Sequence, residues 1–292
     1  MRLGYPCQNL TIPTVFKTCR LKTVQQKGNE VVKDLTLHNI RELKNVLEWN
    51  VSHEIFFFRI SSDMIPFATH EVMDWKWQED EDVQKELKDI QAFQKKWNLR
   101  LSMHPGQYLV LNSPREHVVQ NAIKDLHYHY DFLKAVGGND IILHTGGAYG
   151  DKGTAKETFI NTFQTLPLAI QNMIRLENDD KVFHTRDVLD VSDQCGVTVC
   201  FDIHHEMCFG RTDDELTELF SQVKETWKDS ELIPKVHISS GKRSERDPAH
   251  ADEIRLEDFE RLQQVTKGTD IDCMLEAKSK ELALISLRKQ LE

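Results

Sequence analysis

The stretch Val197-Thr-Val-Cys-Phe-Asp-Ile-His-His205 places a hydrophobic run directly before two side chains that commonly bind metals. Because Val197–Phe201 does not alternate between apolar and polar residues, it predicts a strand that is buried on both faces. Asp202 and His205 follow at its carboxyl end, where ionisable groups cost free energy unless a partner such as a metal ion balances them. Several other predicted strands end in the same way, so this edge of the fold is where we expect the site.

Seven further segments have the pattern of strands, and helical segments separate them. The eight predicted strands are Arg2–Cys7, Glu54–Ile60, Leu99–Met103, Asp140–Thr145, Met173–Asp179, Val197–His205, Pro234–Ser240 and Ile271–Ala277. The predicted helices are Asp34–Trp49, Asp80–Trp97, Glu116–Ala135, Lys156–Ile170, Arg186–Cys195, Asp213–Thr226, Leu256–Val265 and Lys280–Leu291. Eight strand–helix units predict an α/β fold: one (β/α)8 TIM barrel over residues 1–292, with its site at the carboxyl ends of the strands.

Length and composition bound the class of protein. The chain has 292 residues, of which 39% are hydrophobic and 29% charged, and its six cysteines form no Cys-x-x-Cys pair. These values are typical of a globular protein with reduced thiols. Met1–Pro6 lacks the apolar segment of a signal peptide, and no apolar run approaches the roughly 20 residues of a membrane span. We expect a cytoplasmic protein with no membrane partner.

The charge and the glycine pattern constrain the partners. A formal net charge of −10, taken alone, counts against nucleic acid. Divalent cations bound at the site would, however, reverse the local potential, so DNA is not excluded. No Gly-x-Gly-x-x-Gly follows the first predicted strand, which counts against a dinucleotide-binding fold, and we expect no nucleotide cofactor.

Residue types that bind Zn²⁺, Mn²⁺ or Fe gather at the predicted strand ends. Taken singly, each such residue is more often a hydrogen-bonded structural group. A cluster of carboxylates on one barrel rim would repel itself without cations, so the whole set predicts a multinuclear metal site. The set consists of His104, His144, Glu177, Asp202, His205, His237 and Glu276 at strand ends, with His70 and His250 on loops.

A multinuclear site suits phosphodiester hydrolysis, because metals a few ångströms apart activate water and stabilise the attacking and leaving oxygens. The same residues also suit a sugar isomerase. His104-Pro-Gly-Gln-Tyr108 favours a nucleic acid, because an amide and an aromatic ring on a rim loop can stack on bases and fill a gap in a duplex. The alternative for Tyr108 is packing against its own loop. Tyr5 and Asn9 either line the pocket or satisfy the loop after the first strand.

Two basic features have more than one interpretation. Lys235 lies two residues before His237 on one predicted strand, so both side chains point into the barrel. A lysine among metals must be neutral, paired with a carboxylate, or converted to a carbamate. Lys242-Arg-Ser-Glu-Arg246 is either a phosphate clamp or a solvated loop.

Over nearly its full length, the sequence resembles the UV damage endonucleases of bacteria and fungi. The combination of motifs is specific, although any one of them alone is not. The resemblance is carried by Arg2–Asn9, Arg59–Asp63, Pro66–His70, Ser102–Tyr108, His144–Gly147, Leu176–Asp179, Phe201–His205, Lys235–Ser239 and Leu275–Lys278.

The resemblance implies a TIM-barrel relative of endonuclease IV with three divalent metal ions, most often Mn²⁺, with Zn²⁺ or another ion possible. Such enzymes nick damaged double-stranded DNA directly 5′ of cyclobutane dimers, (6-4) photoproducts and some other lesions, which starts an alternative excision repair. We expect a monomer. The implied metal ligands are His70, His104, His144, Glu177, Asp202, His205, His237, His250 and Glu276.

Further roles are also implied by the resemblance. Gln107 and Tyr108 match residues that probe the duplex opposite the lesion, and Tyr5 and Asn9 match residues that line the lesion pocket. Lys235 matches a lysine that can be carboxylated, and it joins Glu177 and Glu276 as a catalytic candidate. The rival functions are an abasic-site endonuclease like endonuclease IV and a metal-dependent sugar isomerase or epimerase on the same barrel. A DNA-binding protein without catalysis would leave the metal cluster without a purpose.

Overall fold

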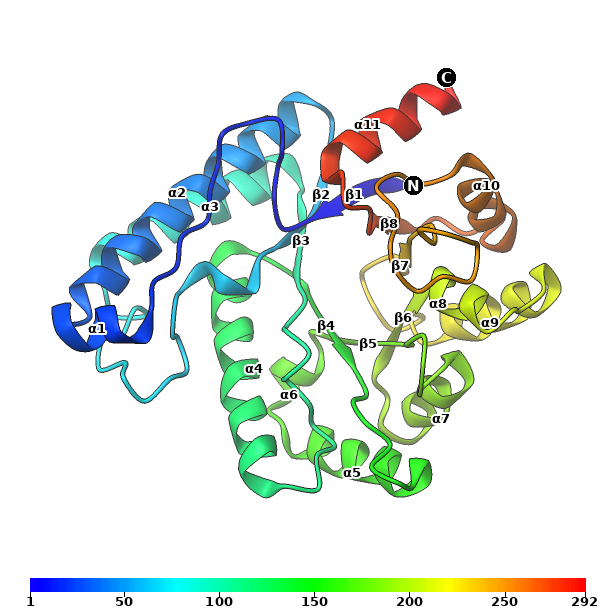
Figure 1. The fold of residues 1–292 in the computed structure, drawn as a ribbon, viewed down its shortest axis with the longest axis horizontal. Helices are drawn as coiled ribbons and strands as arrows, with labels where there is room; N and C mark the ends of the chain where they lie inside the picture. The colour runs from blue at the N-terminus through cyan, green and yellow to red at the C-terminus, as the bar shows by residue number, and fades with distance from the viewer.

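The structure is a computed structural model that describes residues 1–292, and its eight parallel strands close into a barrel in sequence order (Figure 1). The last strand pairs with the first, with Arg2 opposite Asp272. This closure confirms the predicted (β/α)8 fold. The strands are β1 (Arg2–Pro6), β2 (Phe57–Ile60), β3 (Arg100–Met103), β4 (Asp140–His144), β5 (Ile174–Glu177), β6 (Thr198–Asp202), β7 (Lys235–Ile238) and β8 (Asp272–Leu275).

Helices surround the barrel, as Figure 1 shows. No helix combines the length and the apolar character that crossing a bilayer requires. The helices are α1 (Leu21–Lys27), α2 (Glu30–Ser52), α3 (Glu81–Trp97), α4 (Glu116–Val136), α5 (Lys152–Thr165), α6 (Leu168–Gln171), α7 (Thr185–Cys195), α8 (Ile203–Cys208), α9 (Asp213–Glu225), α10 (Leu256–Val265) and α11 (Lys280–Leu291), with a short 3-10 turn, η1 (Ser62–Met64).

The helix predicted over Lys156–Ile170 is wrong in its bounds, because the structure has two helices there, α5 and α6. Leu166 is extended, with φ −69° and ψ 151°, as a residue before proline tends to be, and Pro167 starts the second helix. The first helix begins early because the Asp151 carboxylate accepts a hydrogen bond from the Thr154 N–H at 2.9 Å. Helix α1 was not predicted.

Strand β6 is shorter than predicted, and this changes the element that carries His205. The strand ends at Asp202, whose carboxylate accepts a hydrogen bond from the His205 N–H at 2.9 Å and so caps α8. His205 therefore lies on a short helix rather than on the strand. The apolar part of the prediction is confirmed, because Val199 and Phe201 are both fully buried.

Buried charges are paired at the amino ends of the strands. Arg100 donates to the Asp140 and Asp272 carboxylates, in each case at 2.8 Å. Arg175 donates to the second oxygen of Asp140 at 2.9 Å, and Arg2 donates to both oxygens of Asp272. Each of these two buried carboxylates therefore faces two guanidinium groups. We call these five residues the amino-end ion network.

Candidate metal centre

Glu177, the last residue of β5, lies near three histidines, one directly after β3, one at the end of β4 and one on β7. Its Oε2 is 3.1 Å from His104 Nε2 and 3.5 Å from His144 Nε2. Its Oε1 is 2.6 Å from His237 Nδ1. Since parallel strands of a barrel end at one rim, residues 133 positions apart in the chain (237 − 104) meet around a single carboxylate.

Two groups of ligand atoms share this carboxylate. His104, His144 and Glu177 offer atoms within 4.8 Å of one another, and so do Glu177, Asp202 and His237. Because one oxygen of Glu177 lies toward each group, this carboxylate would be a ligand common to both if divalent metal ions bound there. We call these five residues the candidate metal centre.

Several atoms of this centre are buried without a hydrogen-bond partner. They are Nδ1 of His144, Oδ2 of Asp202 and Nε2 of His237. A buried polar atom without a partner costs free energy that a metal ion would offset. Imidazole nitrogens and carboxylate oxygens together suit Zn²⁺, Mn²⁺ or Fe, so the residues fit divalent metal ions.

The electrostatics prepare these groups for cations. Burial raises the pKa of Glu177, but His237, His144 and His104 outweigh it and hold that pKa well below its ordinary value. Burial lowers the pKa of His144, so its imidazole is neutral near pH 7 and keeps a lone pair for a metal. The site thus presents an ionised carboxylate beside a neutral imidazole.

His205 has a different charge state. Burial lowers its pKa, but Asp202 and Glu177 outweigh burial and raise it to about 9. Its Nδ1 lies 2.8 Å from the Asn178 carbonyl, which accepts a hydrogen bond, and its ring centroid lies 6.1 Å from that of His144. Binding of a metal at His205 would therefore release a proton.

Glu276 extends the centre toward β8 and the loop that follows β7. Its Oε1 is 3.2 Å from His237 Nδ1, and its Oε2 is 3.9 Å from His250 Nδ1. Arg59, near the end of β2, donates to Glu276 through Nη1, while its buried Nε has no partner. Arg59 entered the sequence analysis only within the Arg59–Asp63 motif, with no role assigned to it; its place near the end of a hydrophobic strand was the available signal.

Lys235 is the first residue of β7, two residues before His237 and opposite Asp272 in the register of the barrel. It is fully buried, as is His237, and its Nζ has no hydrogen-bond partner. The ammonium lies 5.1 Å from the centre of the Phe57 ring. Burial lowers the pKa of Lys235 to about 8, although Asp140 opposes that shift.

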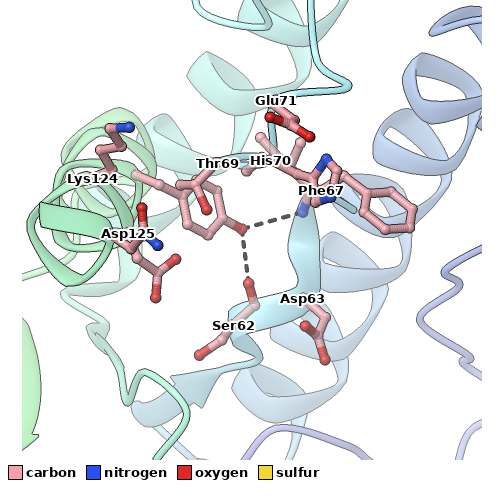
Figure 2. Close-up of a pocket in the computed structure, with 12 residues that line it drawn as sticks. Ser62, Asp63, Phe67, Thr69, His70, Glu71, Lys124 and Asp125 are labelled. Carbon is pink, nitrogen blue, oxygen red and sulfur yellow. Dashed lines mark hydrogen bonds between the residues drawn. The ribbon is translucent and has the colours of Figure 1, made fainter. Parts of the chain in front are cut away.

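The structure does not bring His70 into either ligand group. His70 lines a separate cavity of about 530 Å³ between the loop after β2 and helix α4 (Figure 2). Its Nδ1 accepts a hydrogen bond from the Val72 N–H at 3.0 Å. Tyr128 also lines this cavity, and its hydroxyl donates to the Ser62 carbonyl at 2.9 Å and accepts from the Ile65 N–H at 3.2 Å.

Gln107 and Tyr108 lie on the rim, on the loop that follows His104. Both side chains are exposed, and Tyr108 is 85% exposed, so its ring does not pack against its own loop. Gln107 also lines a cavity of about 550 Å³ that includes His104 and His144. The Gln107 amide is thus presented beside the candidate metal centre, and Tyr108 follows it on the same loop.

Tyr5 and Asn9 are buried and contact each other. The Tyr5 hydroxyl donates to Asn50 Oδ1 at 2.6 Å and accepts from Asn9 Nδ2 at 2.9 Å. Asn9 Oδ1 accepts from the N–H groups of Thr11 and Ile12. In this structure both side chains satisfy the loop after β1, and neither belongs to the ligand groups.

The Lys242–Arg246 segment lies in the long loop after β7. Its residues are exposed, and the Arg243 guanidinium donates to Asp247 at 2.7 Å. The same loop is anchored to α8, where the Asp247 carbonyl lies 3.1 Å from His204 Nε2. The segment therefore has one arginine paired within its own loop.

Comparisons with known proteins agree with the geometry. A family model described as UV-endonuclease UvdE matches residues 1–292. The chain belongs to this family. A UV DNA damage endonuclease of Clostridium perfringens (strain 13 / Type A) is 36% identical to it over 289 residues, which are 98% of this chain and 69% of that protein. The predicted resemblance is confirmed.

Solved structures place this UvdE family member among TIM barrels. SacUVDE has a TM-score of 0.90 at 38% identity, and the match covers 100% of this chain and 98% of SacUVDE. Endonuclease IV from Thermus thermophilus has a TM-score of 0.61 at 11% identity, with 100% of this chain and 99% of that one covered. The second likeness shows a shared fold.

Proposed function

We propose that this chain is a metal-dependent endonuclease that cuts damaged double-stranded DNA directly 5′ of cyclobutane dimers, (6-4) photoproducts and some other lesions. One observation carries the metal dependence, namely that Glu177 presents one oxygen to each of two ligand groups. Membership of the UvdE family and the exposed Tyr108 support damaged DNA as the substrate.

The candidate metal centre would hold two of three divalent ions, most often Mn²⁺. Bound divalent ions supply an activated water and balance charge on the attacking and leaving oxygens. Glu276 and His250 would complete the set on the β8 side, and His205 after loss of its proton. His70 would join only if the loop after β2 moved toward the barrel axis, because it now faces its own cavity.

The remaining residues of the centre keep the ligands in place. Arg59 orients Glu276 and balances part of its charge. Lys235 has no partner for its buried Nζ, which suits carboxylation, because a carbamate would accept hydrogen bonds from nearby guanidinium groups. We assign catalytic roles to Glu177 and Glu276 as ligands and to Lys235 in this modified form.

Recognition of damage begins with the duplex. A photoproduct weakens stacking, so bending and unstacking the damaged duplex cost less than for intact DNA. Tyr108 and Gln107 would insert from the rim and occupy the vacated space. Tyr5 and Asn9 would support the wall of the lesion pocket by holding the loop after β1 in place.

The direct test is the nicking of an end-labelled duplex that carries one thymine dimer, with Mn²⁺ and with EDTA. An abasic duplex and an undamaged duplex serve as controls. We expect a Mn²⁺-dependent cut directly 5′ of the dimer and none in the undamaged duplex. Cutting of the abasic duplex alone would assign the chain to abasic-site repair. If no duplex is cut by metal-loaded protein, the proposal is wrong and sugars become the substrates to test.

A further inference from the structure

One buried carboxylate, that of Glu281, has no role in the function proposed above. Glu281 is the second residue of α11, the helix that follows β8, and it is fully buried. Asp140 and Asp272 face guanidinium groups, whereas no lysine or arginine pairs with Glu281. Burying a carboxylate without a cation costs free energy, which other contacts of Glu281 must offset.

The contacts that offset this cost come from the loop after β1. Glu281 Oε1 accepts hydrogen bonds from the Leu10 N–H at 2.7 Å, from the Thr11 N–H at 2.8 Å and from the Thr11 hydroxyl at 3.0 Å. Hydrogen bonds to an ionised acceptor are stronger than those between neutral groups, and the first turn of a helix favours a negative charge. Its Oε2 is buried and has no partner. All the hydrogen bonds of this carboxylate therefore go to two consecutive residues of one loop.

The same loop holds Asn9 and Tyr5. The Thr11 N–H donates to Asn9 Oδ1 at 2.9 Å as well as to Glu281, so the two acceptors share one donor. Asn9 Nδ2 in turn donates to the Tyr5 hydroxyl at 2.9 Å. Burial raises the pKa of Tyr5 above its ordinary value, and the charge of Glu281 adds to that shift, so the hydroxyl keeps its proton. A continuous series of hydrogen bonds thus connects Glu281 with Tyr5.

The turn that carries Glu281 is fixed from its other side. The N–H groups of Lys278 and Ser279 donate to two consecutive carbonyls of the loop after β7, at 3.1 and 3.0 Å, directly after His250. Lys280 has φ +52°, a left-handed conformation that non-glycine residues seldom adopt and that the surrounding structure must hold. Because α11 also packs beside β1 (Figure 1), the turn joins the loop after β1 to the loop that carries His250.

We infer that Glu281 is a positioning residue for damage recognition: its hydrogen bonds to the loop after β1 hold Asn9 and Tyr5 in the wall of the lesion pocket. The inference deepens the proposed function and rests on it, because a lesion pocket has a purpose only if the chain binds damaged DNA. Glu281 is fully buried, so it acts through the loop rather than by contact with DNA. A loop that is fixed in advance loses less conformational freedom when DNA binds, so binding is tighter.

The test separates positioning from a general loss of stability. Glu281→Leu removes every acceptor and keeps a side chain of similar size. Glu281→Gln keeps a carbonyl oxygen in place of Oε1, so it is the conservative variant that should preserve the contacts. Asp140→Asn is the control for stability, because it breaks contacts at the amino end of the barrel. Binding of a dimer duplex and of an undamaged duplex is measured in EDTA by fluorescence anisotropy, with urea denaturation and metal content measured for each variant.

We expect Glu281→Leu to weaken binding of the dimer duplex about tenfold, because three hydrogen bonds to the loop are lost. Binding of the undamaged duplex should stay within about twofold, since it depends on phosphate contacts. Glu281→Gln and Asp140→Asn should each bind the dimer duplex within about threefold of the unaltered protein, because both keep acceptors for the loop. Metal content should be unchanged in all three variants.

A double variant shows whether Glu281 acts through Asn9. Asn9→Ala alone should weaken binding of the dimer duplex about tenfold, and its combination with Glu281→Leu should lose little more, because contacts within one network are not additive. A loss of about a hundredfold in the double variant would mean that the two residues act independently, which would overturn the inference.

A milder variant serves if Glu281→Leu does not fold. Thr11→Val removes only the hydroxyl that donates to Glu281, so binding of the dimer duplex should fall about threefold, and unchanged binding would then overturn the inference.

The inference and the proposed function can fail separately. If the unaltered protein nicks the dimer duplex while folded Glu281→Leu binds it equally well, the inference is wrong and the proposed function stands. The same conclusion follows if Glu281→Leu weakens binding of the damaged and undamaged duplexes equally. If the unaltered, metal-loaded protein nicks no damaged duplex, the proposed function itself fails.

Discussion

The two ends of this barrel bury charges in opposite ways. At the amino end, Asp140 and Asp272 each face two guanidinium groups within hydrogen-bond distance. At the carboxyl end, Glu177 and Asp202 are equally buried but face mainly histidines. Guanidinium groups of the chain itself balance the buried carboxylates at the amino end. The buried carboxylates at the carboxyl end have few such cations near them.

This difference separates buried charges that stabilise the fold from buried charges that are held in place to bind a metal ion. Removing one partner from a paired buried charge costs stability, because the other charge is left uncompensated. A buried carboxylate surrounded by imidazoles gains its partner only when a metal ion binds, so it is held in place for that ion. We therefore expect substitutions at the two ends to separate into losses of stability and losses of metal.

The largest effect is expected at the carboxyl end. Glu177→Gln removes the carboxylate that both ligand groups share, so we expect bound metal to be lost and nicking to fall about a thousandfold or more. Metal analysis and a nicking assay measure the two effects. The matched control is Glu157→Gln, at an exposed position on α5. This variant should keep both its bound metal and its nicking activity. If Glu177→Gln keeps its full metal content, the expected distinction between a stabilising amino end and a metal-binding carboxyl end is wrong.

At the amino end, Asp140→Asn leaves Arg100 and Arg175 without their shared carboxylate. We expect the free energy of unfolding to fall by about 3–5 kcal/mol, measured by urea denaturation, with metal content of the folded protein unchanged. Asp270→Asn is the control, because Asp270 is an exposed partner of the N-terminus and should cost less than about 1 kcal/mol.

The same network predicts how stability depends on pH. Burial raises the pKa of Asp140, but Arg100 and Arg175 outweigh it and hold that pKa well below its ordinary value. Its contribution to stability is thus complete above the unfolded-state pKa of about 4 and is lost as the pH falls through the lower folded-state pKa. Urea denaturation below about pH 4 should show a shallower loss in Asp140→Asn than in the unaltered protein. Parallel pH profiles would contradict this.

A smaller effect is expected on the rim. Tyr108→Ala and Gln107→Ala should each weaken binding of the dimer duplex about tenfold, because each removes a group that would occupy the opened stack. Anisotropy in EDTA measures binding, and Tyr108→Phe should bind nearly as well as the unaltered protein. Loss of metal from Tyr108→Ala would show that the loop supports the candidate metal centre rather than the DNA.

The smallest effect is expected at Tyr5. Tyr5→Phe removes a hydroxyl that contacts Asn50 and Asn9, so the free energy of unfolding should fall by about 1 kcal/mol. Urea denaturation and duplex binding are measured on the same preparation. A tenfold loss of binding with unchanged stability would make the hydroxyl a direct contact of the lesion.

Much of the fold and of the site could be predicted from the sequence. Strand periodicity located all eight strands, and their shared rim explains why His104, Glu177 and His237 were expected to meet. The break between α5 and α6 was missed, although Pro167 marks it in the sequence. These features depend on local sequence and on one rule of barrel geometry.

Other features depend on contacts that no local pattern records. Arg100 and Asp272 are 172 residues apart in the chain, and their pairing follows from register around the closed barrel. The sharing of Glu177 between two groups and the contact of Arg59 with Glu276 are side-chain orientations of the same kind. His70 was expected among the metal ligands, but it lies on the loop after β2 and lines a separate cavity. The local sequence does not reveal which cavity a side chain on such a loop faces.

Anomalous diffraction from crystals soaked in Mn²⁺ tests the central claim most directly. We expect one peak among His104, His144 and Glu177 and a second among Glu177, Asp202 and His237, with no peak at the amino-end ion network. Nicking of the dimer duplex by the same Mn²⁺-loaded preparation would connect those ions to activity. Active protein without a peak at Glu177 would contradict the account, because the buried carboxylates would then have another purpose.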